Sequence, residues 1–362
     1  MTDQREKTSE EIEELLHEAE KAYQALRLEE ALDLYQKAGR LQPESFAVHL
    51  GLAKTFTRMR RQEKALAATH QALELAPQRS EGHTILGTLL FLADQNDQAR
   101  EALERAIELD AQCPEPHLTL AQVYADLGRT QDAENELKRA RELIEQIPQQ
   151  QRRKSLHAMA LHARTYMNLA QGNDEKAMEL AEETTALEGA NPHASCLAYA
   201  NLGILEARKR RYEQAIEHLE KAFRLNPYFY RAGGVLGRVL LIRNRHARAV
   251  EVLEKVLDLT PDADGAIRYA YGIALAKSGE REGAVSQYRQ ALDRGLRPLD
   301  SIVARCKIIW LSREGRYVII ALLLTAVLAW LVLARPSPQA ITLVTIIAAL
   351  VILQQIMRRP RR

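Results

Sequence analysis

The chain has 362 residues, of which 46% are hydrophobic and 27% are charged, so it is long enough to bury a large core. Its 50 Lys and Arg against 48 Asp and Glu leave a formal charge of +2, which gives no case for nucleic-acid binding. Its three cysteines, Cys113, Cys196 and Cys306, form no CxxC pair, which argues against a disulfide framework or a zinc site.

Residues 1–11 are polar, contain no apolar run that could serve as a signal or an anchor, and are predicted to be disordered. The structured chain is expected to begin at Ile12. Four alanines then recur at intervals of 34 residues, each inside a helical pattern: Ala31, Ala65, Ala99 and Ala133. A fixed period of this length predicts a solenoid whose units bury their faces by stacking on one another.

The repeat covers residues 12–147 and, after an irregular stretch, residues 158–295. The step that follows Ala133 is lengthened to 44 residues by the segment PQQQRRKS, so residues 148–157 are predicted to be a joint. The fifth unit is degenerate, because Thr165 and Thr184 stand where the pattern has Gly and Ala. The alanines of the later units are Ala177, Ala215, Ala249 and Ala284.

The repeat resembles that of the tetratricopeptide family, in which Leu-Gly and aromatic positions in a first helix precede Ala, an aromatic, Ala and Pro in a second. The sixth unit shows the pattern most fully, with Tyr199, Leu202, Gly203, Tyr212, Ala215, Leu219, Ala222 and Pro227. The resemblance implies an all-α, right-handed solenoid of about eight helix-turn-helix repeats. Proteins of this family usually bind peptides on the first helices of their units.

A further helix is predicted within residues 296–316. Five of its side chains recur at helical spacing: Ile302, Val303, Cys306, Ile309 and Trp310. This stripe could cap the exposed face of the last repeat, or it could lie on a membrane surface, and the sequence leaves both interpretations open.

Two uncharged runs of 18 residues follow, one from Tyr317 to Ala334 and one from Ala340 to Met357. At a rise of about 1.5 Å per residue each helix would be roughly 27 Å long, which is enough to span a bilayer. The loop 335–339 holds two prolines, so the runs are predicted to form a transmembrane hairpin. Basic residues precede the first run and fill the tail 358–362, which predicts an integral membrane protein, in a bacterial plasma membrane, with both termini and the repeats in the cytoplasm.

No motif for nucleophilic catalysis or for phosphate binding is present, so we expect no enzyme, no cofactor and no metal site. His49, His83 and His117 share one position in three consecutive units. We expect them to pack between helices, because helix axes lie about 8–10 Å apart whereas a metal needs each ligand nitrogen at about 2 Å.

The resemblance implies a peptide-binding groove along the first helices. In the first half its positions include Leu16, Leu50 and Lys54, which depart from the lysine and asparagine clamp that some family members use for a carboxylate. In the second half the candidates are aromatic and cationic, which suits an extended, partly acidic segment, although burial against a neighbouring unit is the alternative. These candidates are His162, Tyr166, Arg208, Arg231, Arg238, Tyr269 and Lys277.

Basic residues gather in the turns between the two helices of three units, at 58–61 (RMRR), 208–211 (RKRR) and 243–248 (RNRHAR). The last two turns are predicted to lie on one edge of the solenoid. They are either solvated turns or a basic edge that meets anionic lipid or an acidic partner. The basic edge comprises Arg208, Lys209, Arg210, Arg211, Arg243, Arg245 and Arg248.

The sequence therefore predicts a membrane-anchored adaptor or scaffold that binds cytoplasmic protein or peptide segments, with the assembly of a membrane complex as one setting. The alternative is a permanent structural subunit of a larger membrane protein complex.

Overall fold

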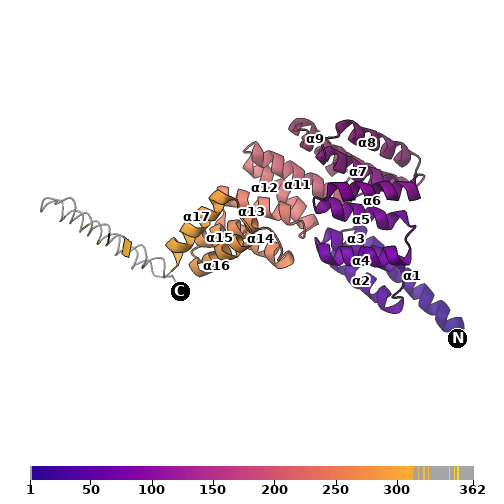
Figure 1. Ribbon diagram of the computed structural model, residues 1–362, viewed down its shortest axis with the longest axis horizontal. Helices are drawn as coiled ribbons and strands as arrows, with labels where there is room; N and C mark the ends of the chain where they lie inside the picture. Colours follow the sequence, from indigo (N-terminus) through magenta and orange to yellow (C-terminus); the bar gives the residue numbers. More distant parts are fainter. Residues whose placement is uncertain are drawn as a thin grey trace. The chain divides into compact units, whose positions relative to one another are not determined.

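All the regular structure in the part of the chain described by the computed structural model is α-helical (Figure 1). That part comprises residues 2–312 and seven isolated positions, Tyr317, Ala321, Leu322, Thr325, Thr342, Ile346 and Ala349. The helices are α1 (Thr2–Gln24), α2 (Leu28–Leu41), α3 (Phe46–Arg58), α4 (Gln62–Leu75), α5 (Ser80–Leu92), α6 (Asn96–Leu109), α7 (Pro114–Asp126), α8 (Thr130–Glu145), α9 (Gln150–Ala170), α10 (Asp174–Thr185), α11 (Pro192–Arg208), α12 (Tyr212–Leu225), α13 (Tyr230–Ile242), α14 (His246–Leu259), α15 (Gly265–Ser278), α16 (Arg281–Asp293) and α17 (Pro298–Leu311).

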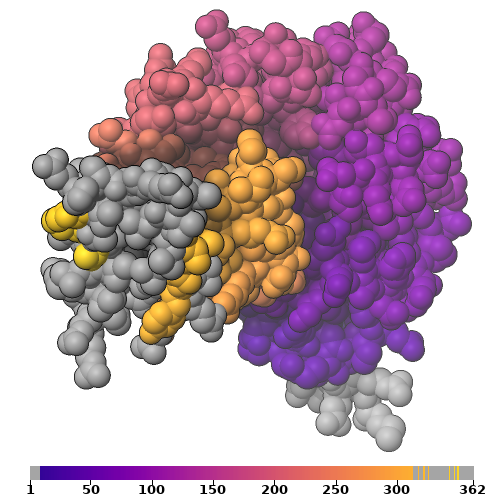
Figure 2. Space-filling view, turned by 60° about the vertical axis from the view of Figure 1, so that its left-hand side comes forward, coloured from indigo at the N-terminus to yellow at the C-terminus, as the bar shows by residue number. Residues whose placement is uncertain are grey.

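The chain forms two compact units, and the first, through Gly233, is a continuous stack of helices. From α1 to α12 every helix packs on the next one in sequence. The first helix of each pair also packs on the first helix of the next pair, from α1 through α11, so the odd-numbered helices form a layer of their own. Figure 2 shows the side chains of this unit as one surface that continues from the indigo first repeats to the magenta later ones. The predicted all-α repeat solenoid is confirmed.

The recurring alanines mark the core. All eight of them, from Ala31 to Ala284, have no exposed surface. Glycines of the first helices lie opposite: a Cβ atom added at Gly87 or Gly203 would come within 2.5 Å of the facing leucine of the second helix. Small residues at both positions therefore let the two helices of a pair approach closely, and a larger side chain would push them apart.

Each turn between the two helices of a pair contains one residue with a positive φ angle. Left-handed backbone is costly for residues that carry a Cβ atom. The turns of the second and sixth pairs nevertheless place arginines there, Arg60 with φ of 56° and Arg210 with φ of 59°. The complete set is Leu26, Arg60, Asp94, Gly128, Gly172, Arg210, Asn244 and Gly279.

Three predicted boundaries differ from the structure. Helix α1 begins at Thr2, so residues 2–11 are helical rather than disordered. The predicted joint, residues 148–157, is almost wholly the start of α9, which begins at Gln150, because Gln, Arg and Lys are good helix formers and Pro148 stands just before it. The two compact units divide instead within α13, between Gly233 and Gly234.

The second unit begins at Gly234 and ends, among the described helices, with α17. Helix α17 packs on α16, and its Ala304 is completely buried. Much of the apolar stripe is exposed, since Ile302 is 59% exposed and Ile309 is 45% exposed. The helix therefore packs on the last pair through the face that holds Ala304, and the membrane-surface interpretation of the stripe stays a prediction.

No helix in the described part of the chain has both the length and the apolar character needed to cross a bilayer. This finding contradicts the predicted integral membrane location, and that prediction is withdrawn. The two predicted spans, the loop 335–339 and the tail 358–362 lie outside the described residues, apart from the seven isolated positions.

Candidate functional site

A cleft of about 480 Å³ opens between α1 and α3 in the first unit. Three of its lining residues, Leu16, Leu50 and Lys54, are positions that the repeat pattern assigned to the peptide groove. The complete lining is Leu16, Glu20, Tyr35, Gln42, Glu44, Ser45, Phe46, Ala47, Leu50, Gly51, Lys54 and Arg79. The cleft thus combines apolar side chains with charges of both signs.

Two contacts hold the walls of this cleft. The hydroxyl of Tyr35 on α2 donates a hydrogen bond to Glu20 Oε2 on α1 at 3.0 Å, and burial together with Glu20 raises the pKa of that hydroxyl. The guanidinium of Arg79 lies 4.8 Å from the centroid of the Phe46 ring. The cation over the ring leaves an apolar ring edge beside a positive charge. This side of the cleft can therefore contact both apolar and acidic groups.

The predicted groove residues of the first unit divide into two exposed and two packed side chains. Arg208 and Arg231 are exposed. His162 is 8% exposed, and burial lowers its pKa to about 4. Tyr166 donates its hydroxyl to Asp126 Oδ1 at 2.8 Å. Because α9 packs on both α7 and α11, residues on its flanks are buried between first helices, as the alternative interpretation expects.

In the second unit, Arg238 and Lys277 are exposed, whereas Tyr269 is partly buried beside Lys307 of α17. The Lys307 Nζ atom lies 5.5 Å from the Tyr269 ring centroid and 5.5 Å from that of Tyr288. Burial and the nearby charge of Lys277 lower the pKa of Lys307.

The predicted basic edge contains partnered side chains. Arg208 lies 3.6 Å from Asp174, and Arg211 lies 3.5 Å from Glu206. Arg210 is exposed. Arg243, Arg245 and Arg248 are also exposed, in the α13–α14 turn and the first turn of α14. Contact of this edge with anionic lipid or an acidic partner stays a prediction.

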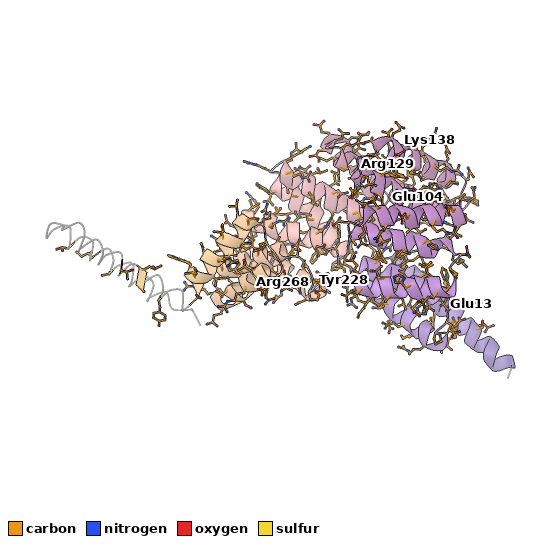
Figure 3. The ribbon with its side chains drawn as sticks, viewed as in Figure 1. Glu13, Glu104, Arg129, Lys138, Tyr228 and Arg268 are labelled. Carbon is orange, nitrogen blue, oxygen red and sulfur yellow. The ribbon has the colours of Figure 1, made fainter. Side chains whose placement is uncertain are left out.

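The loop between α12 and α13 makes contacts that the sequence analysis did not foresee. The amide Nδ2 of Asn226 donates to the carbonyl oxygen of Arg58 at 3.3 Å. The hydroxyl of Tyr228, which is labelled in Figure 3, donates to Glu29 Oε1 at 2.8 Å. The Arg60 guanidinium lies 5.3 Å from the centroid of the Phe229 ring.

We call these three contacts the clasp. They join residues of the first two repeats to the loop that follows the sixth. In a solenoid each repeat normally contacts only its neighbours, so the clasp closes the first unit on itself. Its one sequence signal is the aromatic run of residues 228–230 (YFY) in a loop, and Tyr228 is indeed buried at 3% exposure.

The three histidines at a shared position have local partners. Nε2 of His49 lies 2.7 Å from the carbonyl oxygen of Pro43, and Nε2 of His83 lies 2.9 Å from that of Pro77. Nδ1 of His117 lies 2.6 Å from Glu136 Oε2. Only His117, at 6% exposure, is buried between helices, whereas His49 and His83 are partly exposed beside loop carbonyl groups.

The comparison with protein families decides the classification. The family described as the Tetratricopeptide repeat protein 21 C-terminal ARM domain matches residues 84–268, which is more than half of the chain. The chain belongs to this family. The match includes α6 to α14 of the helical stack, so this ARM-type member has the tetratricopeptide-like repeat architecture that its alanine period predicted. A search of curated protein sequences found no match.

Solved structures share the fold of this family member at low sequence identity. The crystal structure of the APC/C hetero-tetramer Cut9–Hcn1 has 16% identity and a TM-score of 0.58, and the match covers 81% of this chain and 55% of that one. A monomeric mutant of IFIT1 with m7Gppp-AAAA has 17% identity and a TM-score of 0.54, with 81% and 70% covered. The chain therefore spans only about half of the matched chain in the Cut9–Hcn1 structure, and these similarities show the fold alone.

Proposed function

We propose that this protein is a repeat scaffold that binds an extended protein segment on its layer of first helices. The observation that carries the proposal is the α1–α3 cleft, which offers about 480 Å³ on the surface where the repeat pattern places a groove. The proposal assigns no catalytic role to the chain.

The chemistry of the cleft defines the segment. Leu16, Leu50 and Phe46 provide apolar surface for one anchoring side chain. Lys54 stands beside it and can contact an acidic group of the segment, whereas Arg79 is paired with Glu81 and Glu20 is already engaged by Tyr35. A segment with an apolar anchor flanked by an acidic residue fits best.

Peptide selection tests this proposal. Peptides selected from a displayed random library on the purified protein should bind by fluorescence polarisation. Phe46→Ala and Lys54→Glu should each weaken that binding about tenfold, which corresponds to about 1.4 kcal/mol. Phe46 and Lys54 are both only partly buried, so neither change removes a core side chain.

The matched control is Lys138→Glu, which makes the same charge reversal on the exposed face of α8, the second helix of its pair (Figure 3). It should leave peptide affinity unchanged. If the library yields no binder, or if Lys138→Glu weakens binding as much as the cleft variants, the cleft is not the site.

A second candidate function is that of a permanent subunit of a larger protein complex. It is favoured by α17, where Leu299 is 77% exposed and Ile302 is 59% exposed, since such apolar surface is commonly covered by another protein. Co-purification at fixed stoichiometry through a high-salt wash would favour the subunit, and salt-labile partners would favour the scaffold.

A further inference from the structure

An aromatic pair joins the first helices of three consecutive pairs in the first unit. The rings of Phe91 on α5 and Tyr166 on α9 pack edge to face, with their centroids 5.7 Å apart. Both helices pack on α7, which has Ala125 at the position that Phe91 occupies one repeat earlier. The small side chain of Ala125 leaves room for the two rings to meet across α7. Both rings are partly exposed.

Two carboxylates border this aromatic pair. The hydroxyl of Tyr166 donates a hydrogen bond to Asp126 Oδ1 at 2.8 Å. Asp94 lies in the turn that follows Phe91, and its backbone N–H donates to the carbonyl oxygen of Phe91 at 3.1 Å. Both aspartates are exposed. Each of the two rings therefore has an exposed carboxylate near it.

The chain itself does not neutralise these carboxylates. Asp94 and Asp126 have no ion-pair partner among the described residues, and the exposed Arg231 of α13 forms an ion pair with neither. The cation nearest to Asp126 in sequence, Arg129, is paired with Asp132 at 2.6 Å. This edge of the first unit consequently presents two negative charges that a partner can pair.

Exposed leucines lie beside the rings and the carboxylates. Leu92 directly follows Phe91, Leu127 directly follows Asp126, and each leucine is 38% exposed. Large apolar side chains that are exposed next to an aromatic pair form a surface of the kind that other proteins cover. We call the following residues the acidic–aromatic surface: Phe91, Leu92, Asp94, Asp126, Leu127 and Tyr166.

We propose that the acidic–aromatic surface binds a segment of a partner protein in which lysine or arginine side chains stand next to apolar ones. A cation over an aromatic ring is attracted by the ring face, and a nearby carboxylate adds to this attraction. The exposed leucines contact the apolar side chains of the same segment. First helices that pack about 8–10 Å apart spread the surface over roughly 20 Å, which an extended segment crosses in about six residues.

This inference goes beyond the proposed function, because the acidic–aromatic surface shares no residue with the α1–α3 cleft. The cleft selects an acidic group beside an apolar anchor, whereas this surface selects a cation. Either proposal can therefore fail while the other holds.

Fluorescence polarisation with the full chain tests the surface. The probes are three labelled, blocked peptides that each contain four copies of Gly-Leu-Lys, Gly-Leu-Gln or Gly-Leu-Glu. We expect saturable binding of the lysine peptide, at least tenfold weaker binding of the glutamine peptide, and none of the glutamate peptide. Equal binding of the lysine and glutamine peptides, or no binding of the lysine peptide, overturns the proposal.

The double variant Asp94→Asn with Asp126→Asn should weaken binding of the lysine peptide about tenfold. Both changes keep the size of the side chain and one acceptor oxygen, so Tyr166 keeps its hydrogen bond. Asparagine also tolerates the positive φ of 58° at position 94, so the fold is retained.

The matched control is the double variant Asp33→Asn with Asp110→Asn. It removes the same charge from two exposed aspartates, one on α2 and one at the C-terminal end of α6, and should leave the affinity unchanged. Phe46→Ala, which alters the cleft, should also leave it unchanged. Equal losses in the two double variants, or a loss in Phe46→Ala, overturn the assignment of the peptide to this surface.

Discussion

The turns 58–61 and 208–211 have nearly the same sequence and the same backbone, yet they lie in different environments. Both are basic, both follow a first helix, and both place an arginine at positive φ, Arg60 at 56° and Arg210 at 59°. Arg60 packs on Phe229, whereas Arg210 is exposed. The comparison teaches that the repeat fixes the form of a turn, while the closure of the solenoid decides which turn contacts a distant loop.

The largest expected effect comes from removing the clasp. Tyr228 is 3% exposed, so Tyr228→Ala should lower the free energy of unfolding by about 4 kcal/mol. Tyr228→Phe loses only the hydrogen bond to Glu29 and should cost about 1 kcal/mol. Urea unfolding measures both changes. If Tyr228→Ala lowers the free energy of unfolding no more than Tyr228→Phe does, the clasp does not stabilise the turn 58–61.

The next effect is acid sensitivity at a buried histidine of α9. The pKa of His162 is lowered from 6.5 to about 4, so its neutral form stabilises the fold above pH 6.5 and that stability is lost as the pH falls towards 4. The loss is on the order of 3 kcal/mol. His162→Gln should flatten the decline in unfolding free energy over this window.

The pH dependence of the unfolding free energy in variants of the two turns tests the difference between them. Arg60→Gln removes a positive charge that opposes protonation of His193, so acid destabilisation should be smaller in this variant. Arg210→Gln should follow the parent chain. Identical pH profiles for the two variants would contradict the difference between the turns.

A smaller effect is expected from relief of backbone strain. Arg210→Gly should raise the free energy of unfolding by about 0.5 kcal/mol, because glycine adopts positive φ freely although it gains entropy in the unfolded chain. Arg60→Gly should gain less, since it also loses the contact with Phe229. Thermal unfolding compares the two, and equal gains would show that the Arg60 side chain contributes nothing to the clasp.

The smallest effect concerns the exposed turn. Arg208 lies 3.6 Å from Asp174 with 62% of its side chain exposed. Arg208→Gln should therefore change the free energy of unfolding by less than about 0.5 kcal/mol. If urea unfolding shows that Arg208→Gln lowers the free energy of unfolding by more than about 1 kcal/mol, the turn 208–211 is stabilised by its contacts as strongly as the turn 58–61.

Part of the candidate site could be read from the sequence. The positions of Leu16, Leu50 and Lys54 in the first helices followed from the repeat, and all three line the α1–α3 cleft. His162 and Tyr269 were assigned to the groove by the same rule, but α11 and α17 pack over their surroundings. The position of a residue in a repeat predicts the direction of its side chain. It does not predict which other helices pack against that side chain.

By itself the sequence determined the helical pairs, the eight buried alanines and the turns, because each depends only on contacts within a repeat or between neighbours. The tertiary structure alone decided the clasp and the face that α17 turns to α16. The clasp depends on small rotations that accumulate over many repeats and bring Arg58 beside Asn226, 168 residues away. No sequence pattern within one repeat predicts such an accumulated rotation.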